Sequence, residues 1–140
     1  MFRIAKEFRF ESAHLLDGHD GQCRHLHGHS YRLRVEVAGE ALQPTGPKAA
    51  MLLDYQDLKS WVETQILTAL DHAFLYDRNS ERECQIAALL QSFAAKTYAL
   101  DGRTTCENLC RHIFDVLGAD LPLSRIRLYE TASSYCEYER

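Results

Sequence analysis

The sequence lacks any long apolar run, and no segment approaches the roughly 20 consecutive apolar residues that a membrane-spanning helix needs. It also lacks a cluster of Lys and Arg, and its formal net charge is −4. Nucleic acid is therefore not expected as the main partner. The first residues alternate charged and apolar side chains, without the apolar core of a signal peptide. We expect a cytoplasmic protein whose partner is a small molecule, with neither a membrane nor a nucleic-acid partner.

No internal repeat, low-complexity tract or interdomain linker divides the chain. With 140 residues, of which 46% are hydrophobic and 26% charged, it has the composition of a soluble globular protein. A chain of this length can bury roughly two-thirds of its unfolded surface. We therefore expect a single domain over residues 1–140. The five cysteines are odd in number, which favours reduced thiols over a disulfide framework.

Period-2 alternation of apolar residues predicts four strands. The apolar residues Phe2, Ile4, Phe8 and Phe10 fall on even positions, and odd positions are apolar over residues 31–37. These two segments are expected to pair antiparallel. Alternation over residues 125–130 predicts a third strand, and residues 134–139 can pair back as a fourth. Strands grouped in hairpins are typical of the α+β class.

Helical spacing and capping residues predict three helices between the second and third strands. The first covers residues 55–69, after an Asp54 cap. The second is short and runs from a Ser80 cap to about residue 94. The third begins at a Thr104-x-x-Glu107 capping box and ends at Gly118.

The segment from Cys23 to His29 reads Cys-Arg-His-Leu-His-Gly-His and combines a thiol with closely spaced imidazoles. On a strand, side chains two residues apart share a face, so His27 and His29 can bind one ion, while Gly28 permits a close backbone approach. His14 follows the first predicted strand, and antiparallel pairing would bring it beside them. Imidazole suits zinc, and three such ligands leave one coordination position open, as in catalytic sites. The sequence predicts a Zn2+ site.

Two neighbours of these histidines leave alternatives open. His25 would share the ligand face of a perfectly regular strand, although we favour His14 as the third ligand. Cys23 either closes the site as a fourth, structural ligand or is a nucleophile or base whose pKa is lowered by zinc and imidazole. The chain has no helical His-Glu-x-x-His motif, so a zinc hydrolase is the least favoured class.

Three further polar residues are candidates for chemistry. Asp71 and His72 follow the first predicted helix and either cap its C-terminus or form a proton-transfer pair. Adjacent side chains usually point apart, so the two need not contact each other. Glu130 shares a strand face with Ile126 and Leu128. It is either a surface carboxylate or a buried acceptor of two parallel N–H bonds from a planar heterocycle.

These residues occur together in one known protein family. In chain order the motifs are Phe10-Glu-Ser-Ala-His14, C-x-x-x-H-G-H from Cys23, Leu70-Asp-His72, Thr105-x-Glu-Asn108 and Glu130-Thr131. Together they cover nearly the whole chain. The sequence resembles the 6-pyruvoyl-tetrahydropterin synthase superfamily, and within it the 6-carboxy-5,6,7,8-tetrahydropterin synthase branch of queuosine biosynthesis. The spacing of four from Cys23 to His27 favours that branch over the 6-pyruvoyl one.

The resemblance implies a T-fold, a four-stranded antiparallel sheet with two main helices between strands 2 and 3; here a short extra helix is added. It implies a zinc-dependent lyase that converts 7,8-dihydroneopterin triphosphate to 6-carboxytetrahydropterin, acetaldehyde and triphosphate. The family forms homohexamers, as dimers of trimers, with active sites between subunits. Two departures are Thr104, where the family usually has Pro, and a longer segment over residues 78–103.

Residue roles also follow from the resemblance. The implied zinc ligands are His14, His27 and His29. Cys23 would be the catalytic thiol, while Asp71 and His72 serve the proton transfers, in a neighbouring subunit if the sites lie between subunits. Glu130, helped by Thr105, would anchor the pterin ring.

Overall fold

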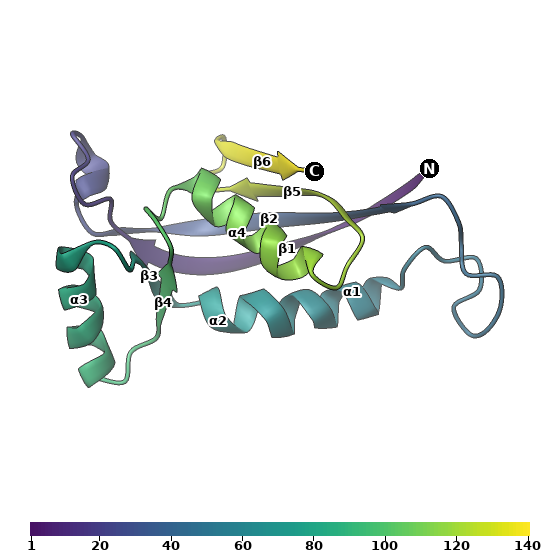
Figure 1. Ribbon diagram of the computed structural model, residues 1–140, viewed down its shortest axis with the longest axis horizontal. Coiled ribbons are helices and arrows are strands. Elements are labelled where there is room, and N and C mark those ends of the chain that lie inside the picture. Colours follow the sequence, from purple (N-terminus) through teal and green to yellow (C-terminus); the bar gives the residue numbers. More distant parts are fainter.

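A long antiparallel hairpin forms the centre of the sheet (Figure 1). In the computed structural model, which describes residues 1–140, β1 (Phe2–His14) pairs with β2 (His27–Gly39) along its whole length. The register places His14 opposite His27. The predicted pairing is confirmed, but β1 is longer than expected, because His14 is its last residue rather than lying beyond it.

The sheet has six strands in the order β4-β3-β1-β2-β5-β6. The strands β5 (Leu123–Tyr129) and β6 (Tyr135–Glu139) extend the antiparallel part beyond β2, as predicted. The expected count of four strands is wrong. Two short strands, β3 (Ala73–Asp77) and β4 (Thr97–Leu100), run parallel to β1 on its other side. Their short apolar runs carry no alternation, and β3 forms because β1 offers it an edge.

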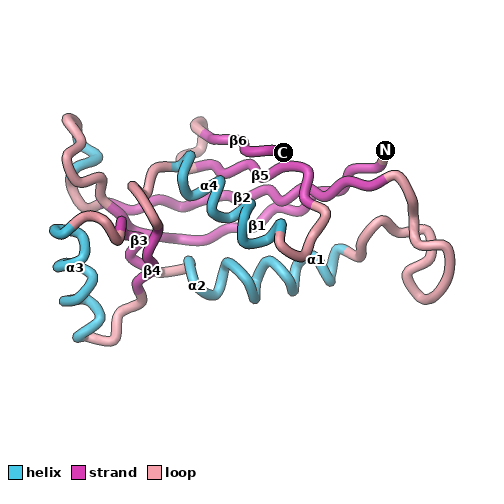
Figure 2. Tube along the Cα trace, in the orientation of Figure 1, coloured by secondary structure: helices cyan, strands magenta, loops and turns pink.

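Two helical segments cover one face of the sheet (Figures 1 and 2). The first is continuous and comprises α1 (Tyr55–Val62), the π-helical turn η2 (Glu63–Leu67) and α2 (Thr68–Leu70). Asp54 caps it by accepting a hydrogen bond from the Gln56 N–H. The second is α4 (Cys106–Gly118), which packs against β5 and β6. Both predicted helices are confirmed. None of the helices has the length and apolar character that a membrane span requires.

The predicted short helix is α3 (Glu81–Ser92), which lies beside β3 and β4 at one end of the molecule. Its Ser80 cap accepts a hydrogen bond from the Glu83 N–H at 3.1 Å, as expected. The capping box assigned to α4 is wrong by one residue. The cap is Thr105, whose hydroxyl accepts from the Asn108 N–H at 3.3 Å, because Thr104 is buried and turned towards His14.

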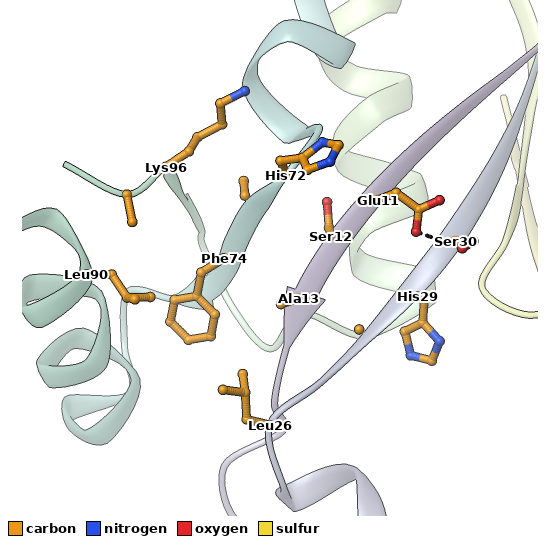
Figure 3. A pocket seen from close by; sticks show the side chains of 13 residues that line it. Glu11, Ser12, Ala13, Leu26, His29, Ser30, His72, Phe74, Leu90 and Lys96 are labelled. Carbon is orange, nitrogen blue, oxygen red and sulfur yellow. Dashed lines mark hydrogen bonds between the residues drawn. The ribbon is translucent and has the colours of Figure 1, made fainter. Parts of the chain in front are cut away.

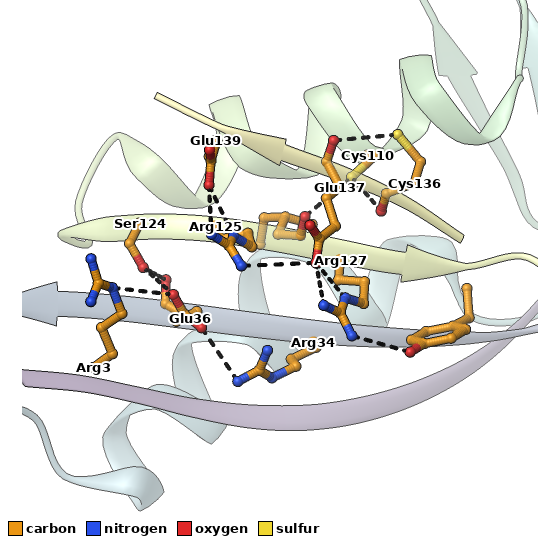
Figure 4. Close-up of polar contacts among 12 residues, drawn as sticks. Arg3, Arg34, Glu36, Cys110, Ser124, Arg125, Arg127, Cys136, Glu137 and Glu139 are labelled. Atoms are coloured by element: carbon orange, nitrogen blue, oxygen red, sulfur yellow. Dashed lines mark hydrogen bonds and ion pairs between the residues drawn. The ribbon is translucent and has the colours of Figure 1, made fainter. Parts of the chain in front are cut away.

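The two faces of the sheet differ sharply in polarity. The face beneath α1 and α4 packs against these helices to form the core. The core includes Phe8, Leu33, Val35, Ile126 and Leu128 from the strands and Leu58, Ile66, Leu109, Ile113 and Leu117 from the helical segments. The opposite face carries charged side chains, including the pairs Arg125–Glu139 and Arg127–Glu137 (Figure 4). Burial of the apolar face therefore fixes the register of the central hairpin. The same register places the histidines.

Candidate functional site

Three histidines meet at the end of the β1–β2 hairpin where the loop joins its two strands. His14 ends β1, His27 begins β2, and His29 follows two residues later on the same face. One ligand atom from each lies within 4.8 Å of those of the other two. Gly28 allows the two strands to approach, since a Cβ atom there would lie 3.2 Å from the Ser12 carbonyl oxygen. His25 is exposed and lies outside the cluster.

The hydrogen bonds of these imidazoles fix their tautomers. His14 Nδ1 lies 2.9 Å from the Thr104 carbonyl oxygen, and His27 Nδ1 lies 2.7 Å from the His25 carbonyl oxygen. A carbonyl only accepts, so each Nδ1 carries the hydrogen and each Nε2 presents a lone pair. These two Nε2 atoms are 3.1 Å apart. Two lone pairs at this distance repel each other, and a cation between them removes the repulsion.

The third imidazole also fits a metal ion. His29 Nε2 is buried and has no hydrogen-bond partner. Burial lowers the pKa of His14 to about 4 and also lowers the pKa of His29, so both rings are neutral at neutral pH. Neutral imidazoles held through Nδ1 by backbone carbonyls are the usual ligands of zinc. The donor set therefore suits Zn2+.

A cavity of about 250 Å³ adjoins the triad. Its walls include His14, Cys23, Thr105 and Glu130. A Glu130 carboxylate oxygen lies 3.7 Å from His29 Nε2. The structure therefore brings four of the predicted site residues to one cavity. Cys23 lies in its wall and is not a member of the candidate metal-binding cluster.

The remaining predicted pair, Asp71 and His72, lies in contact. His72 Nδ1 is 3.0 Å from the Asp71 carboxylate, whereas adjacent side chains were expected to point apart. The reason is that His72 adopts a left-handed backbone, with φ of 62°, which turns its ring back. The N–H of Glu11 donates to the Asp71 carboxylate at 2.9 Å and lowers its pKa, with a further contribution from His72. Asp71 therefore stays ionised and can orient the imidazole.

The longer segment over residues 78–103 reaches this pair. Lys96 Nζ donates to the Asp71 carbonyl oxygen at 2.7 Å and to the Thr68 carbonyl oxygen at 2.9 Å. Lys96 and His72 lie together at one side of a second cavity of about 490 Å³, which has an apolar wall that includes Phe74 (Figure 3). In one chain, His72 lines this second cavity together with His29, whereas Cys23 lines the first.

Sequence reasoning missed three residues at these sites. Thr104 had one signal, its replacement of the family's usual Pro, but its contact with His14 depends on the fold. Lys96 carried no signal, because its partners are carbonyl oxygens. Tyr31 has the alternation of a core residue, and only the structure shows that its buried hydroxyl has no partner. The pocket walls also include Cys106 and Cys136, which are partly buried and pack against the core.

A helix-backed sheet with three histidines at the end of its central hairpin, next to a pocket with a thiol and a carboxylate, defines a candidate metal-dependent protein of the T-fold class. The chain belongs to the 6-pyruvoyl tetrahydropterin synthase family, whose model matches residues 3–140. It is 54% identical over 141 residues to the 6-carboxy-5,6,7,8-tetrahydropterin synthase of Haemophilus influenzae, covering 99% of each chain. It is 47% identical over 77 residues to the Synechocystis protein of the same name, covering 55% of this chain and 60% of that protein.

Solved structures show the same fold at low identity. An uncharacterized protein, WS1659 from Wolinella succinogenes, superposes with a TM-score of 0.83 at 19% identity, covering 99% of this chain and 98% of that one. The 6-pyruvoyl tetrahydropterin synthase of Caenorhabditis elegans gives a TM-score of 0.70 at 21% identity, covering 99% and 95%. The T-fold is therefore confirmed, with two strands more than the four expected.

Proposed function

We propose that the protein is a zinc-dependent carbon–carbon lyase, a 6-carboxytetrahydropterin synthase of queuosine biosynthesis. It would convert 7,8-dihydroneopterin triphosphate and water to 6-carboxy-5,6,7,8-tetrahydropterin, acetaldehyde and triphosphate. The observation that carries the proposal is that His14 of the histidine triad lines one cavity together with Cys23, Thr105 and Glu130. The name of the Haemophilus influenzae relative supports it.

The residues of the cavity suit the parts of such a substrate. Glu130 accepts two N–H bonds from the pterin ring, the geometry that a carboxylate binds best. Thr105 also lines the cavity and would support the ring, although its hydroxyl caps α4 as well. Zinc held by the triad would supply Lewis acidity to the side-chain hydroxyls of the substrate. Cys23, in the wall beside His14, would move protons at the substrate side chain.

The Asp71–His72 pair would complete these proton transfers from a neighbouring subunit. His72 lines a different cavity from Cys23 within one chain, and its side chain is 75% exposed. Both observations support active sites between subunits, which the proposed homohexamer, a dimer of trimers, would provide. Exposed apolar side chains such as Phe2, Leu26 and Phe93 are available for burial in such an assembly.

The expected location is the cytoplasm. All five cysteines are free, and three of them, Cys23, Cys106 and Cys136, share the pocket wall. A compartment that keeps thiols reduced suits this arrangement.

Product analysis tests the proposal. The zinc-loaded protein is incubated with 7,8-dihydroneopterin triphosphate, and the pterins and volatile aldehyde are identified by mass spectrometry. The expected products are the carboxylated tetrahydropterin and acetaldehyde, and Glu130→Gln should abolish both. A product that keeps the three-carbon side chain would assign the 6-pyruvoyl activity instead. If neither the carboxylated pterin nor the pterin with the three-carbon side chain forms, the enzyme assignment is overturned and a zinc-stabilised module without catalysis is favoured.

A further inference from the structure

The hydroxyl of Tyr31 is a buried donor without a partner. Tyr31 is 1% exposed, and its hydroxyl oxygen makes no hydrogen bond. A buried polar group left unpaired costs free energy, and the few that occur in folded proteins call for a reason. Phe would fill the same space without this cost. The hydroxyl is therefore expected to serve a partner that becomes available only during function.

The ring of Tyr31 is held so that the hydroxyl cannot turn to another partner. It stacks on Phe10, with ring centroids 4.8 Å apart and an angle of 9° between the planes. The His29 ring meets it edge-on at 5.5 Å. Stacked and edge-on contacts of this kind fix an aromatic ring in one orientation. The hydroxyl direction is consequently set by the core.

That direction brings the hydroxyl to the side of Glu130. Arg32 of β2 pairs with Tyr129 of β5, so the register places Tyr31 opposite Glu130 one residue further along. Side chains directly opposite on one face of an antiparallel pair are close neighbours. A phenol is protonated at neutral pH and able to donate.

Resting on the proposed function, we infer that Tyr31 is a positioning residue that donates a hydrogen bond to the Glu130 carboxylate when a pterin ring is bound. In the free protein Glu130 lies near His29, 3.7 Å from Nε2. An ionised carboxylate has about four acceptor positions, enough for two ring N–H groups and one phenol. The phenol would hold the carboxylate in the plane of the ring. Because the hydroxyl is buried, water would not take its place.

The test compares Tyr31→Phe with Glu130→Gln and the double variant. The probe is neopterin, which has the pterin ring and the hydroxylated side chain but no triphosphate, and binding is followed by its fluorescence. Tyr31→Phe should weaken neopterin binding about tenfold, the size of one hydrogen bond to a charged group. Because Tyr31 acts through Glu130, the double variant should bind no more weakly than Glu130→Gln alone. Additive losses would overturn the inference.

Thermal stability separates this role from a structural one. Removing an unpaired hydroxyl should leave the melting temperature of Tyr31→Phe unchanged or raise it by about 3 °C. The matched control is Tyr98→Phe, because the Tyr98 hydroxyl makes a hydrogen bond with His112 Nε2 at 2.6 Å. It should lower the melting temperature by about 3 °C and leave neopterin binding unchanged.

The outcomes distinguish the inference from the proposed function. If the wild-type protein does not bind neopterin, or Glu130→Gln binds it equally well, the assignment of the pterin pocket fails and the role of Tyr31 fails with it. If Glu130→Gln loses binding while Tyr31→Phe keeps it, only the inference about Tyr31 is overturned. A Tyr31→Phe variant that melts earlier, as Tyr98→Phe is expected to, would likewise show that the hydroxyl already has a structural partner.

Discussion

His14 and His27 face each other through their unprotonated Nε2 atoms, 3.1 Å apart, while each Nδ1 is held by a backbone carbonyl. This relationship is set by the last pair of the β1–β2 register, in which the two residues are opposite each other. The fold thus holds two electron pairs together, an arrangement that is stable when a cation is bound. The third candidate ligand, His29, lies on the same face of β2 as His27.

Thr104 is expected to tune the affinity for zinc. Its carbonyl and hydroxyl oxygens lie 2.9 and 3.1 Å from His14 Nδ1. Thr104→Val keeps the carbonyl and the shape but removes the hydroxyl, and groups that orient metal ligands contribute at least tenfold. We predict about a tenfold weaker affinity, measured by competition with a chelator. Thr97→Val is the control, because Thr97 contacts only Gln91 through its hydroxyl, and an equal loss there would contradict the prediction.

Lys96 is expected to support turnover by holding the Asp71–His72 turn. Lys96→Met removes the donor to two carbonyl oxygens at the end of α2, and the left-handed His72 then loses part of its support. A small displacement of a proton-transfer group costs roughly tenfold or more in rate. We predict that kcat falls by about tenfold while bound zinc, measured by atomic absorption, is unchanged.

The control for Lys96 is Lys59→Met, which removes an exposed ion pair with Glu63 and should change neither quantity, since such pairs contribute little. An unchanged kcat in Lys96→Met would contradict the role of this lysine. It would also leave the segment over residues 78–103 with only α3 and β4 as a structural contribution.

Glu83 is expected to make stability fall as pH rises. Burial raises the pKa of this carboxyl above its ordinary value, although the Asp77 N–H opposes the shift. The folded state therefore keeps the Glu83 proton to higher pH than the unfolded state does. Between the unfolded and the folded pKa of this carboxyl, the unfolded state binds fewer protons. Stability then decreases as pH rises from about 4.5 through the raised pKa. In chemical denaturation, wild type should lose stability relative to Glu83→Gln over this range, and a constant difference would contradict the shift.

The sequence predicts the antiparallel hairpins well because their signal is local. Alternation along β1, β2 and β5 reports which face is buried, and the cap residues Asp54 and Ser80 mark helix starts directly. The strands β3 and β4 carry no such signal. They form because a neighbouring edge and α3 provide the burial, which only the tertiary structure contains.

The candidate site likewise has a part that local sequence patterns predict and a part that they do not. His14, His27 and His29 could be grouped from spacing because the register of one hairpin brings them together. Contacts between distant segments could not be predicted, such as Thr104 with His14 or Lys96 with Asp71. The contact of Asp71 with His72 depends on a positive φ angle, which a non-glycine residue adopts only when its surroundings impose it.

The most direct test concerns Cys23, since the central claim is that the triad holds zinc alone and leaves this thiol free for chemistry. Cys23→Ser should keep its zinc and its melting temperature while turnover of 7,8-dihydroneopterin triphosphate falls about 10²- to 10⁴-fold, as for loss of a proton-transfer group. Cys84→Ser, whose thiol contacts only backbone carbonyls of the chain, should keep both. Loss of zinc together with unfolding in Cys23→Ser would contradict the claim and make Cys23 a structural ligand.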